Sequence, residues 1–195
     1  MMKYLQKLGK ALMLPVAALP VAGILMGVGY ALAPAVMGVP GAEAAGAAYT
    51  VGFLLIKAGA ALIDNMAWLF AIGAAVGLAD DHDGTAGLAG LVAFLMIQQL
   101  LNPAVVGTVR GMDADAQAAW LLTAEGIAFS KIAGNCFIGI LSAVIGGTMY
   151  NKFKDTRLPD WLAFFSGKRC VAIMTALVSI IASVVLLFVW PIIFD

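Results

Sequence analysis

The residues of this chain that could do chemistry are few, and the densest group is the run ADDHDG at 79–84. It sets His82, the single histidine, among Asp80, Asp81 and Asp83. Carboxylates around an imidazole are suited to binding a metal ion or to sensing pH near neutrality. A solvated polar turn is the simpler interpretation, because Asp and Gly favour turns and the run separates two apolar stretches.

The remaining reactive side chains are isolated. Cys136 and Cys170 lie in or beside apolar stretches, without a CxxC motif or a nearby histidine, so they indicate small packing residues and neither a metal nor a redox site. Asp64 is the one acid inside an otherwise apolar stretch. A carboxylate deep in a span is typical of proton-coupled carriers, but a half-helix capped by Asp64 or Asn65 is the favoured and simpler explanation.

Two adjacent cations, Lys168 and Arg169, stand where the stretch LPDWLAFFSGKRCVAI enters an apolar run. One interpretation is that they anchor a helix end to lipid headgroups, together with an interfacial belt of aromatic residues. The other is that they contact an anionic partner or a gate. Gly167 before them favours a turn, because glycine gives the backbone freedom to re-enter a bilayer. The aromatic residues concerned are Trp161, Phe164 and Phe165.

The composition decides where all these residues must sit. Of the 195 residues, 63% are hydrophobic and 11% are charged, whereas a soluble domain carries about 25% charged residues. The formal net charge is zero, so nothing indicates a nucleic-acid partner. Long uncharged runs and 22 glycines are typical of helices packed closely in lipid. The sequence therefore predicts an all-α membrane protein embedded in the lipid bilayer.

The apolar runs predict about five transmembrane helices after a short amphipathic helix at 1–10. Pro15 and Pro20 predict a kink in the first of them. Residues 34–47 are expected to form a loop, and 102–130 a more polar outer loop. The expected spans are 11–33, 48–79 with a break near residue 64, 85–101, 131–150 and 170–192.

The charges settle how the 48–79 stretch is counted. It could be one broken span or two full spans. Lys3, Lys7 and Lys10 mark the N-terminus as cytoplasmic, and the cations of the loop 151–169 mark that loop as cytoplasmic too. Both assignments hold only if an even number of crossings separates them. One broken span satisfies this condition, so we expect five spans with the C-terminus outside.

Four segments, spread in order over the chain, resemble the IIC membrane permease component of the bacterial phosphoenolpyruvate-dependent sugar phosphotransferase system, glucose branch. They are LQKLGKALMLPVAALPVAGILMGVG (5–29), NMAWLFAIGAAVGLADDHDGTAGLAGLVAF (65–94), YNKFKDTRLPDWLAFFSGKRCVAI (150–173) and FVWPIIF (188–194). HDGTAGLA, FIGIL and SGKRCVAI look most like N-acetylglucosamine-specific members, with glucose as the near alternative.

The resemblance implies a mechanism and a setting. A IIC component in the bacterial inner membrane binds a sugar from outside and exposes it to the cytoplasm, where the phosphocysteine of a IIB domain phosphorylates it. The neutral sugar needs a polar cavity, since its hydroxyls cannot stay unpaired in lipid. The resemblance also implies a homodimer, to which the small-residue faces of spans one, three and four are suited. It implies no cofactor.

One departure from the family changes what this chain is expected to do. No segment matches the sugar-binding histidine and glutamate motifs, which lie in the second half of such permeases, and neither cysteine has a IIB-like context. The resemblance then implies the scaffold and dimerisation half, which meets sugar only together with the second half. Here we expect no catalytic, metal or substrate-binding residue. A regulatory scaffold pairing with an intact IIC, and a small oligomeric carrier, are the alternatives.

Overall fold

The computed structural model describes residues 2–157, 159, 164 and 166–194, with the backbone alone for 2–5 and 193–194. In that part of the chain the regular structure consists of helices, without strands. Among the described residues, four helices are long and apolar enough to cross a membrane, and a bent pair adds a fifth if it counts as one span. The predicted class, an all-α membrane protein with about five spans, is confirmed. Trp161 and Phe165 lie outside the described residues.

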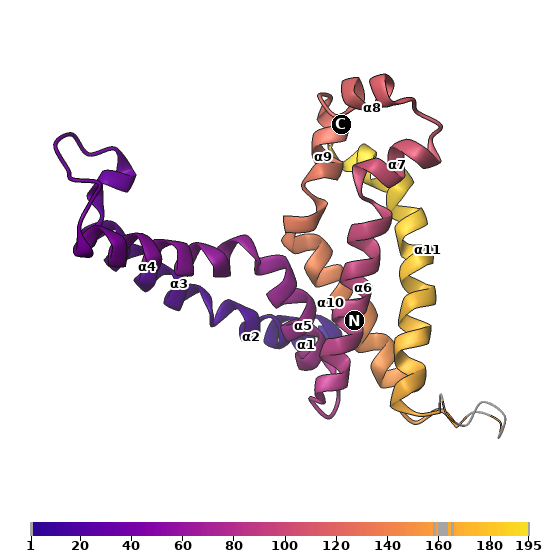
Figure 1. Cartoon of the computed structure of the whole chain (residues 1–195). Coiled ribbons are helices and arrows are strands. Elements are labelled where there is room, and N and C mark those ends of the chain that lie inside the picture. The colour runs from indigo at the N-terminus through magenta and orange to yellow at the C-terminus, as the bar shows by residue number, and fades with distance from the viewer. Residues whose placement is uncertain (1, 158, 160–163, 165, 195) are drawn as a thin grey trace.

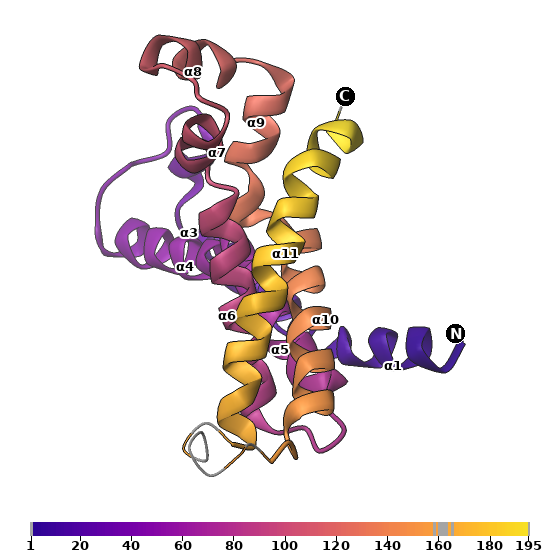
Figure 2. The same ribbon diagram turned by 90° about the vertical axis from the view of Figure 1, so that its right-hand side faces the viewer.

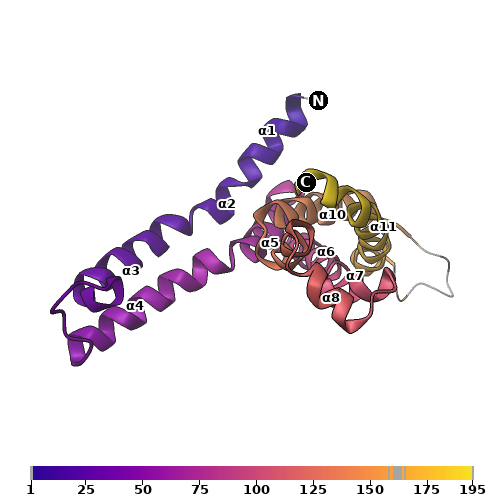
Figure 3. The ribbon, with the colours of Figure 1, turned by 90° about the horizontal axis from the view of Figure 1, so that it is seen from above.

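The N-terminal third begins with three helices that follow one another almost in line (Figure 3). The predicted amphipathic segment is the first of them. The expected kink takes the form of an interruption at residues 17–18, between Pro15 and Pro20, and Pro20 sits at the start of the next helix. The three helices are α1 (Met2–Ala11), α2 (Met13–Val16) and α3 (Leu19–Leu32).

Helix α4 (Ala47–Asp64) returns alongside α3, and the pair extends sideways from the rest of the molecule (Figure 1). The stretch between them, predicted as a loop, contains the short 3-10 helix η1 (Pro34–Met37). Close contact is possible because both helices present glycine: a Cβ on Gly29 would lie 2.7 Å from the carbonyl oxygen of Gly52. Small residues allow this approach between helices in lipid.

The helical run breaks at Asn65, and α5 (Met66–Leu78) sets off from it. Asn65, one of the two predicted capping residues, occupies the N-cap position of α5, but the expected capping bond from its side chain is not made. The side chain of Asn65 instead donates a hydrogen bond to the Ala61 carbonyl at 2.8 Å, and no side-chain cap bond is made to α5. The reason is the backbone at Asn65, with φ −105° and ψ 21°, which is not the extended conformation that lets an N-cap oxygen reach the next amides.

Four helices form the bundle: α5, α6 (Gly84–Leu100), α10 (Cys136–Phe153) and α11 (Lys168–Phe194) (Figure 1). Glycines set the spacing here too. A Cβ on Gly90 would lie 2.2 Å from the Ala71 carbonyl oxygen, and one on Gly146 would lie 2.3 Å from the Gly90 nitrogen. The small-residue faces of α6 and α10, which suited a homodimer, are therefore used in packing within the chain.

The polar segment expected as an outer loop at 102–130 is largely helical. Asn102 accepts a hydrogen bond from the Ala104 amide and starts a helix bent by 57° from α6. Because residues 131–135 still belong to this segment, α10 begins at Cys136 rather than at 131, with Asn135 as its N-cap. The segment contains α7 (Pro103–Val109), α8 (Ala114–Trp120), α9 (Ala124–Ser130) and the 3-10 helix η2 (Ile132–Gly134).

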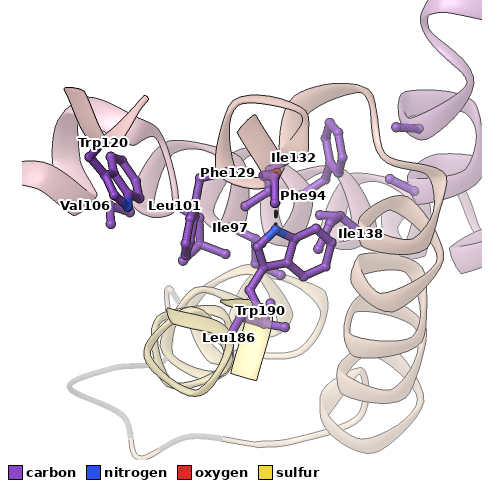
Figure 4. Close-up of a cluster of buried hydrophobic side chains, with 13 residues drawn as sticks. Phe94, Ile97, Leu101, Val106, Trp120, Phe129, Ile132, Ile138, Leu186 and Trp190 are labelled. Atoms are coloured by element: carbon purple, nitrogen blue, oxygen red, sulfur yellow. Dashed lines mark hydrogen bonds between the residues drawn. The ribbon is translucent and has the colours of Figure 1, made fainter. Parts of the chain in front are cut away.

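The main apolar cluster joins this segment to the bundle. Figure 4 shows Trp190 of α11 pointing into a group of side chains from α6, α9 and α10. Its indole N–H donates to the Ala128 carbonyl at 3.2 Å. Trp120 and Phe129 extend the cluster towards α8, with their ring centroids 5.6 Å apart. The cluster holds the α7–α9 segment on the end of the bundle near the C-terminus (Figure 2).

Candidate functional site

The acidic run between α5 and α6, residues 79–84, brings together chain segments that are far apart in sequence. We call it the acidic turn. The Asp80 carboxylate lies 2.5 Å from the Lys7 ammonium of α1, and that of Asp81 lies 3.3 Å from the ammonium of Lys154, just after α10. Asp83 pairs with Lys168 at the start of α11. The predicted polar turn is exposed to solvent, and in addition each of its carboxylates has a lysine partner.

Neutral polar groups fix the turn to α10. The Tyr150 hydroxyl donates to Asp81 at 2.9 Å, while the Tyr150 side chain is fully buried. Asn151 donates to the Leu78 carbonyl and accepts from the Asp80 amide, at 2.9 and 3.0 Å. A side-chain amide that satisfies one backbone acceptor and one donor acts as a short piece of secondary structure. The turn and the end of α10 thus form one hydrogen-bonded unit.

The turn also starts the next helix. Asp83 is the N-cap of α6 and accepts from the Thr85 amide at 2.7 Å, which satisfies one of the free N–H groups of the first turn. His82 adopts a positive φ of 52° and its Nδ1 lies 3.3 Å from the Val76 carbonyl. Among the residues that the structure describes, no group of three or more His, Cys, Asp or Glu side chains could hold a metal ion.

The ion pairs keep all three carboxyl groups charged. Hydrogen bonds from Lys168 and from Thr85 hold the pKa of Asp83 well below its usual range, and the hydrogen bond from Lys7 lowers the pKa of Asp80. Burial alone would raise the pKa of Asp81, but bonds from Tyr150 and Lys154 outweigh it and lower that pKa. Water screens each pair, since the three carboxylate side chains are 28–62% exposed. Their joint effect is to fasten several helix ends to one turn.

These pairs predict that acid loosens the turn. A carboxyl group whose pKa is lowered by folding stabilises the folded state above its unfolded pKa of about 3.9, and this contribution disappears as the pH falls through the lower folded value. We expect the melting temperature in detergent micelles, followed between pH 7 and 2.5, to fall more steeply below about pH 4 in the parent chain than in a variant carrying Asp80→Asn, Asp81→Asn and Asp83→Asn. Equal slopes would contradict this assignment.

Lys168 and Arg169, singled out from the sequence, sit beside this turn. Lys168 pairs with Asp83, and the Arg169 guanidinium lies 4.6 Å from the centre of the Phe164 ring while donating to the Phe164 carbonyl at 3.1 Å. Gly167 has the positive φ of 68° expected for a turn, and its amide donates to Thr156. Contact of Lys168 and Arg169 with a partner or gate stays a prediction.

The arrangement places the N-terminal helix and the basic loop at the same end of the bundle. Lys7, Lys154 and Lys168 all reach one six-residue turn, so the segments that carry them lie side by side. The C-terminus lies at the opposite end (Figure 2). The sequence contained a signal for these contacts, because acids concentrated in a single turn match lysines near the ends of three other apolar segments.

A second ionic site, which the sequence did not reveal, stabilises that opposite end. Arg110 lies 2.7 Å from Glu125, and the Trp120 indole donates to the same carboxylate at 3.0 Å. The guanidinium also lies 5.5 Å from the Trp120 ring and 5.6 Å from that of Phe129. Burial would raise the pKa of Glu125, but the bonds from Trp120 and Arg110 lower it. This cluster ties α8 and α9 to the end of α7.

Comparison with known proteins gives consistent results along the chain. The family model described as "Phosphotransferase system, EIIC" matches residues 9–195. The N-acetylglucosamine-specific EIICB component of Bacillus subtilis (strain 168) is 35% identical over 191 residues, which are 98% of this chain and 33% of that protein.

Two proteins of Staphylococcus carnosus (strain TM300) are similarly related. The glucoside-specific EIICBA component is 37% identical over 196 residues, with 96% of this chain and 28% of that protein covered. The glucose-specific EIICBA component is 36% identical over 189 residues, with 96% and 27% covered. The chain thus spans a third or less of the length of these curated relatives. The resemblance found in the sequence segments is confirmed, and this chain belongs to the EIIC family of the phosphotransferase system.

Proposed function

We propose that this chain forms the scaffold half of a phosphotransferase-system permease for N-acetylglucosamine or glucose, and that it contains no sugar pocket itself. The sugar class follows from the names of the relatives, which are specific for N-acetylglucosamine, glucosides and glucose. Translocation would be coupled to phosphorylation only in the complete permease.

The observation that carries this proposal is how the buried serine side chains are bonded. Among the described residues, the buried hydroxyl-bearing aliphatic side chains are Ser142, Thr175, Ser179 and Ser183, and none of them carries a charge. The Thr175 hydroxyl and the side-chain oxygen of Gln98 are the buried polar atoms without a hydrogen-bond partner in the described part of the chain. The serine hydroxyls each donate to the carbonyl four residues earlier in their own helix, at 2.7 Å. A sugar site needs polar groups that converge on a cavity. Hydroxyls turned back on their own helices leave the interior suited to packing.

We also propose the orientation predicted from the charges, with the acidic turn, the N-terminus and the loop 151–169 on the cytoplasmic side of the bacterial inner membrane. The ion pairs of the acidic turn support a common side for these segments, and the excess of cations there favours the cytoplasm. A IIB domain would meet the permease at this end, since the relatives' names join a C to a B component. A homodimer stays part of the proposal.

The proposal is tested by restoring a complete permease. The chain would be fused in place of the matching third of the B. subtilis relative and expressed in cells lacking their own glucose and N-acetylglucosamine uptake. We expect the fusion to support phosphoenolpyruvate-dependent uptake of one of these sugars, whereas this chain alone, or the remaining two thirds of the relative alone, gives none. Immunoblots of the membrane fraction would control for the amount of each protein.

The alternatives give different results in the same experiment. Sugar uptake into vesicles containing this chain alone would contradict the scaffold assignment and favour an independent carrier. A fusion that reaches the membrane in normal amounts but transports nothing would equally overturn it. Co-purification with an intact permease whose rate it alters, without any restored uptake, would indicate a regulatory scaffold.

A further inference from the structure

A groove of about 530 Å³ lies between the first turns of α6 and α11, next to the acidic turn. Its walls are mainly apolar, with Leu88 contributed by α6 and Ile173 by α11. Lys168, Arg169 and Phe164 line its charged end. The groove therefore combines a cationic end with apolar walls.

The walls of the groove face outwards into what must be the bilayer. The side chains of Leu88 and Ile173 are 54% and 43% exposed, although both belong to apolar helices. The same side of α11 continues with exposed Leu177, and a second hollow of about 140 Å³ is lined by Ile180 and Val184 together with residues of α6 and α7. From Lys168 to Val184 the helix rises by roughly 24 Å, which is comparable with an extended acyl chain.

The charged end attracts an anion. Arg169 is held over the Phe164 ring by stacking and by one hydrogen bond, and within the described part of the chain its other N–H groups stay available. Lys168 is partly neutralised by Asp83, while the next carboxylate, Asp81, is paired with Lys154. Among the described groups lining the groove and its turn, the positive charge of Arg169 is left without a carboxylate partner.

We propose that this groove binds one anionic phospholipid of the surrounding bilayer, with its phosphate at Arg169 and Lys168 and an acyl chain along Leu88 and Ile173. A soluble acidic domain would reach only the cationic end and would leave the apolar walls uncovered. A phospholipid satisfies both parts at the depth where each lies, since headgroups sit at the helix ends and chains beside the apolar spans. The inference concerns this chain itself and does not depend on the proposed transport function.

Native mass spectrometry of the purified full chain tests the site. The chain would be offered equal amounts of phosphatidylglycerol and phosphatidylcholine with identical acyl chains. We expect preferential retention of phosphatidylglycerol, and a decrease of about fivefold in that preference for Arg169→Gln, as expected for one cation at a lipid surface. Lys152→Gln removes a positive charge from the same end but outside the groove, so it is the matched control and should leave the preference unchanged.

A second variant is expected to increase the preference for phosphatidylglycerol instead of decreasing it. Asparagine caps helices as well as aspartate does, so Asp83→Asn keeps the start of α6 while releasing Lys168 from its ion pair. We expect the preference for phosphatidylglycerol to increase several-fold in Asp83→Asn. Melting temperatures of all variants would verify that each is folded before the lipids are compared.

Several results would overturn the site. Equal losses for Arg169→Gln and Lys152→Gln would mean that the lipid responds only to the general charge of this end. Displacement of the lipid by an equal concentration of glycerol phosphate would mean that only the phosphate is bound and that the acyl chain does not occupy the groove. Displacement by a soluble IIB domain would make the two cations part of a protein interface.

Discussion

Gly146→Ala is expected to destabilise the bundle more than any other addition of a single methyl group to α10. The new Cβ would lie 2.3 Å from the backbone nitrogen and 2.5 Å from the Cα of Gly90, both far inside van der Waals contact. Neither atom belongs to a flexible side chain, so α6 and α10 must move apart. A Cβ on Gly90 would itself lie 2.2 Å from the Ala71 carbonyl oxygen, so α6 is also packed closely against α5 and a shift of α6 disturbs that contact. Overpacking of this kind costs about 3 kcal/mol in the free energy of unfolding.

The matched control is Gly23→Ala, the same substitution in the interior of α3. No heavy atom lies within 4 Å of an ideal Cβ at Gly23, so the gain in helix propensity of about 1 kcal/mol should be realised. Unfolding by increasing SDS in mixed micelles, followed by tryptophan fluorescence, would measure both variants. If the two changed the midpoint in the same direction and by similar amounts, the close approach of α6 and α10 would be refuted.

Local patterns explain why the class and many of the helices could be predicted. The hydropathy of a run of residues indicates whether that run lies in lipid or in water. Apolar stretches therefore locate membrane helices without any knowledge of the helices that pack against them. The break beside Asp64 and the turn at Gly167 are equally local, because polar residues interrupt an apolar run and glycine permits a positive φ.

Contacts between distant segments could not be predicted in the same way. Lys7 and Asp80 are separated by 73 positions, and Asp83 and Lys168 by 85, so no local pattern links them. Their charges suggested a solvated turn and an anchored helix end, each taken alone. The positive-inside rule predicted that Lys7 and Lys168 lie on the same side of the membrane. That shared location could have suggested that both lysines contact the acidic turn.

The prediction that the polar segment 104–128 forms a loop failed for a different reason. Its composition indicated an outer loop, whereas Arg110, Glu125 and Trp120 form a partly buried ionic and aromatic cluster there. Composition indicates only whether a segment as a whole favours water or lipid. It does not show that a few polar side chains satisfy one another while the apolar ones pack onto the bundle.

The packing of the α7–α9 segment onto the bundle depends most on Trp190. Trp190→Ala is therefore expected to detach this segment from α11. Trp190 is 1% exposed, its ring centroid lies 6.3 Å from that of Phe137, and its N–H is bonded to Ala128. Removing a buried indole costs about 4 kcal/mol through lost contacts and the cavity left behind. The Ala128 carbonyl would also lose its donor, whereas Trp190→Phe removes the N–H but keeps a ring and should cost about 1 kcal/mol.

Phe188→Ala is the control on the same helix, because Phe188 is 69% exposed and does not belong to the cluster. Its replacement should change the free energy of unfolding by less than about 0.5 kcal/mol. Hydrogen exchange separates a local effect from a global one: Trp190→Ala should accelerate exchange of the α9 amides while those of α5 and α6 near the acidic turn stay protected. Uniform acceleration over the chain, or equal effects of Trp190→Ala and Phe188→Ala, would mean that Trp190 does not fasten this segment to the bundle.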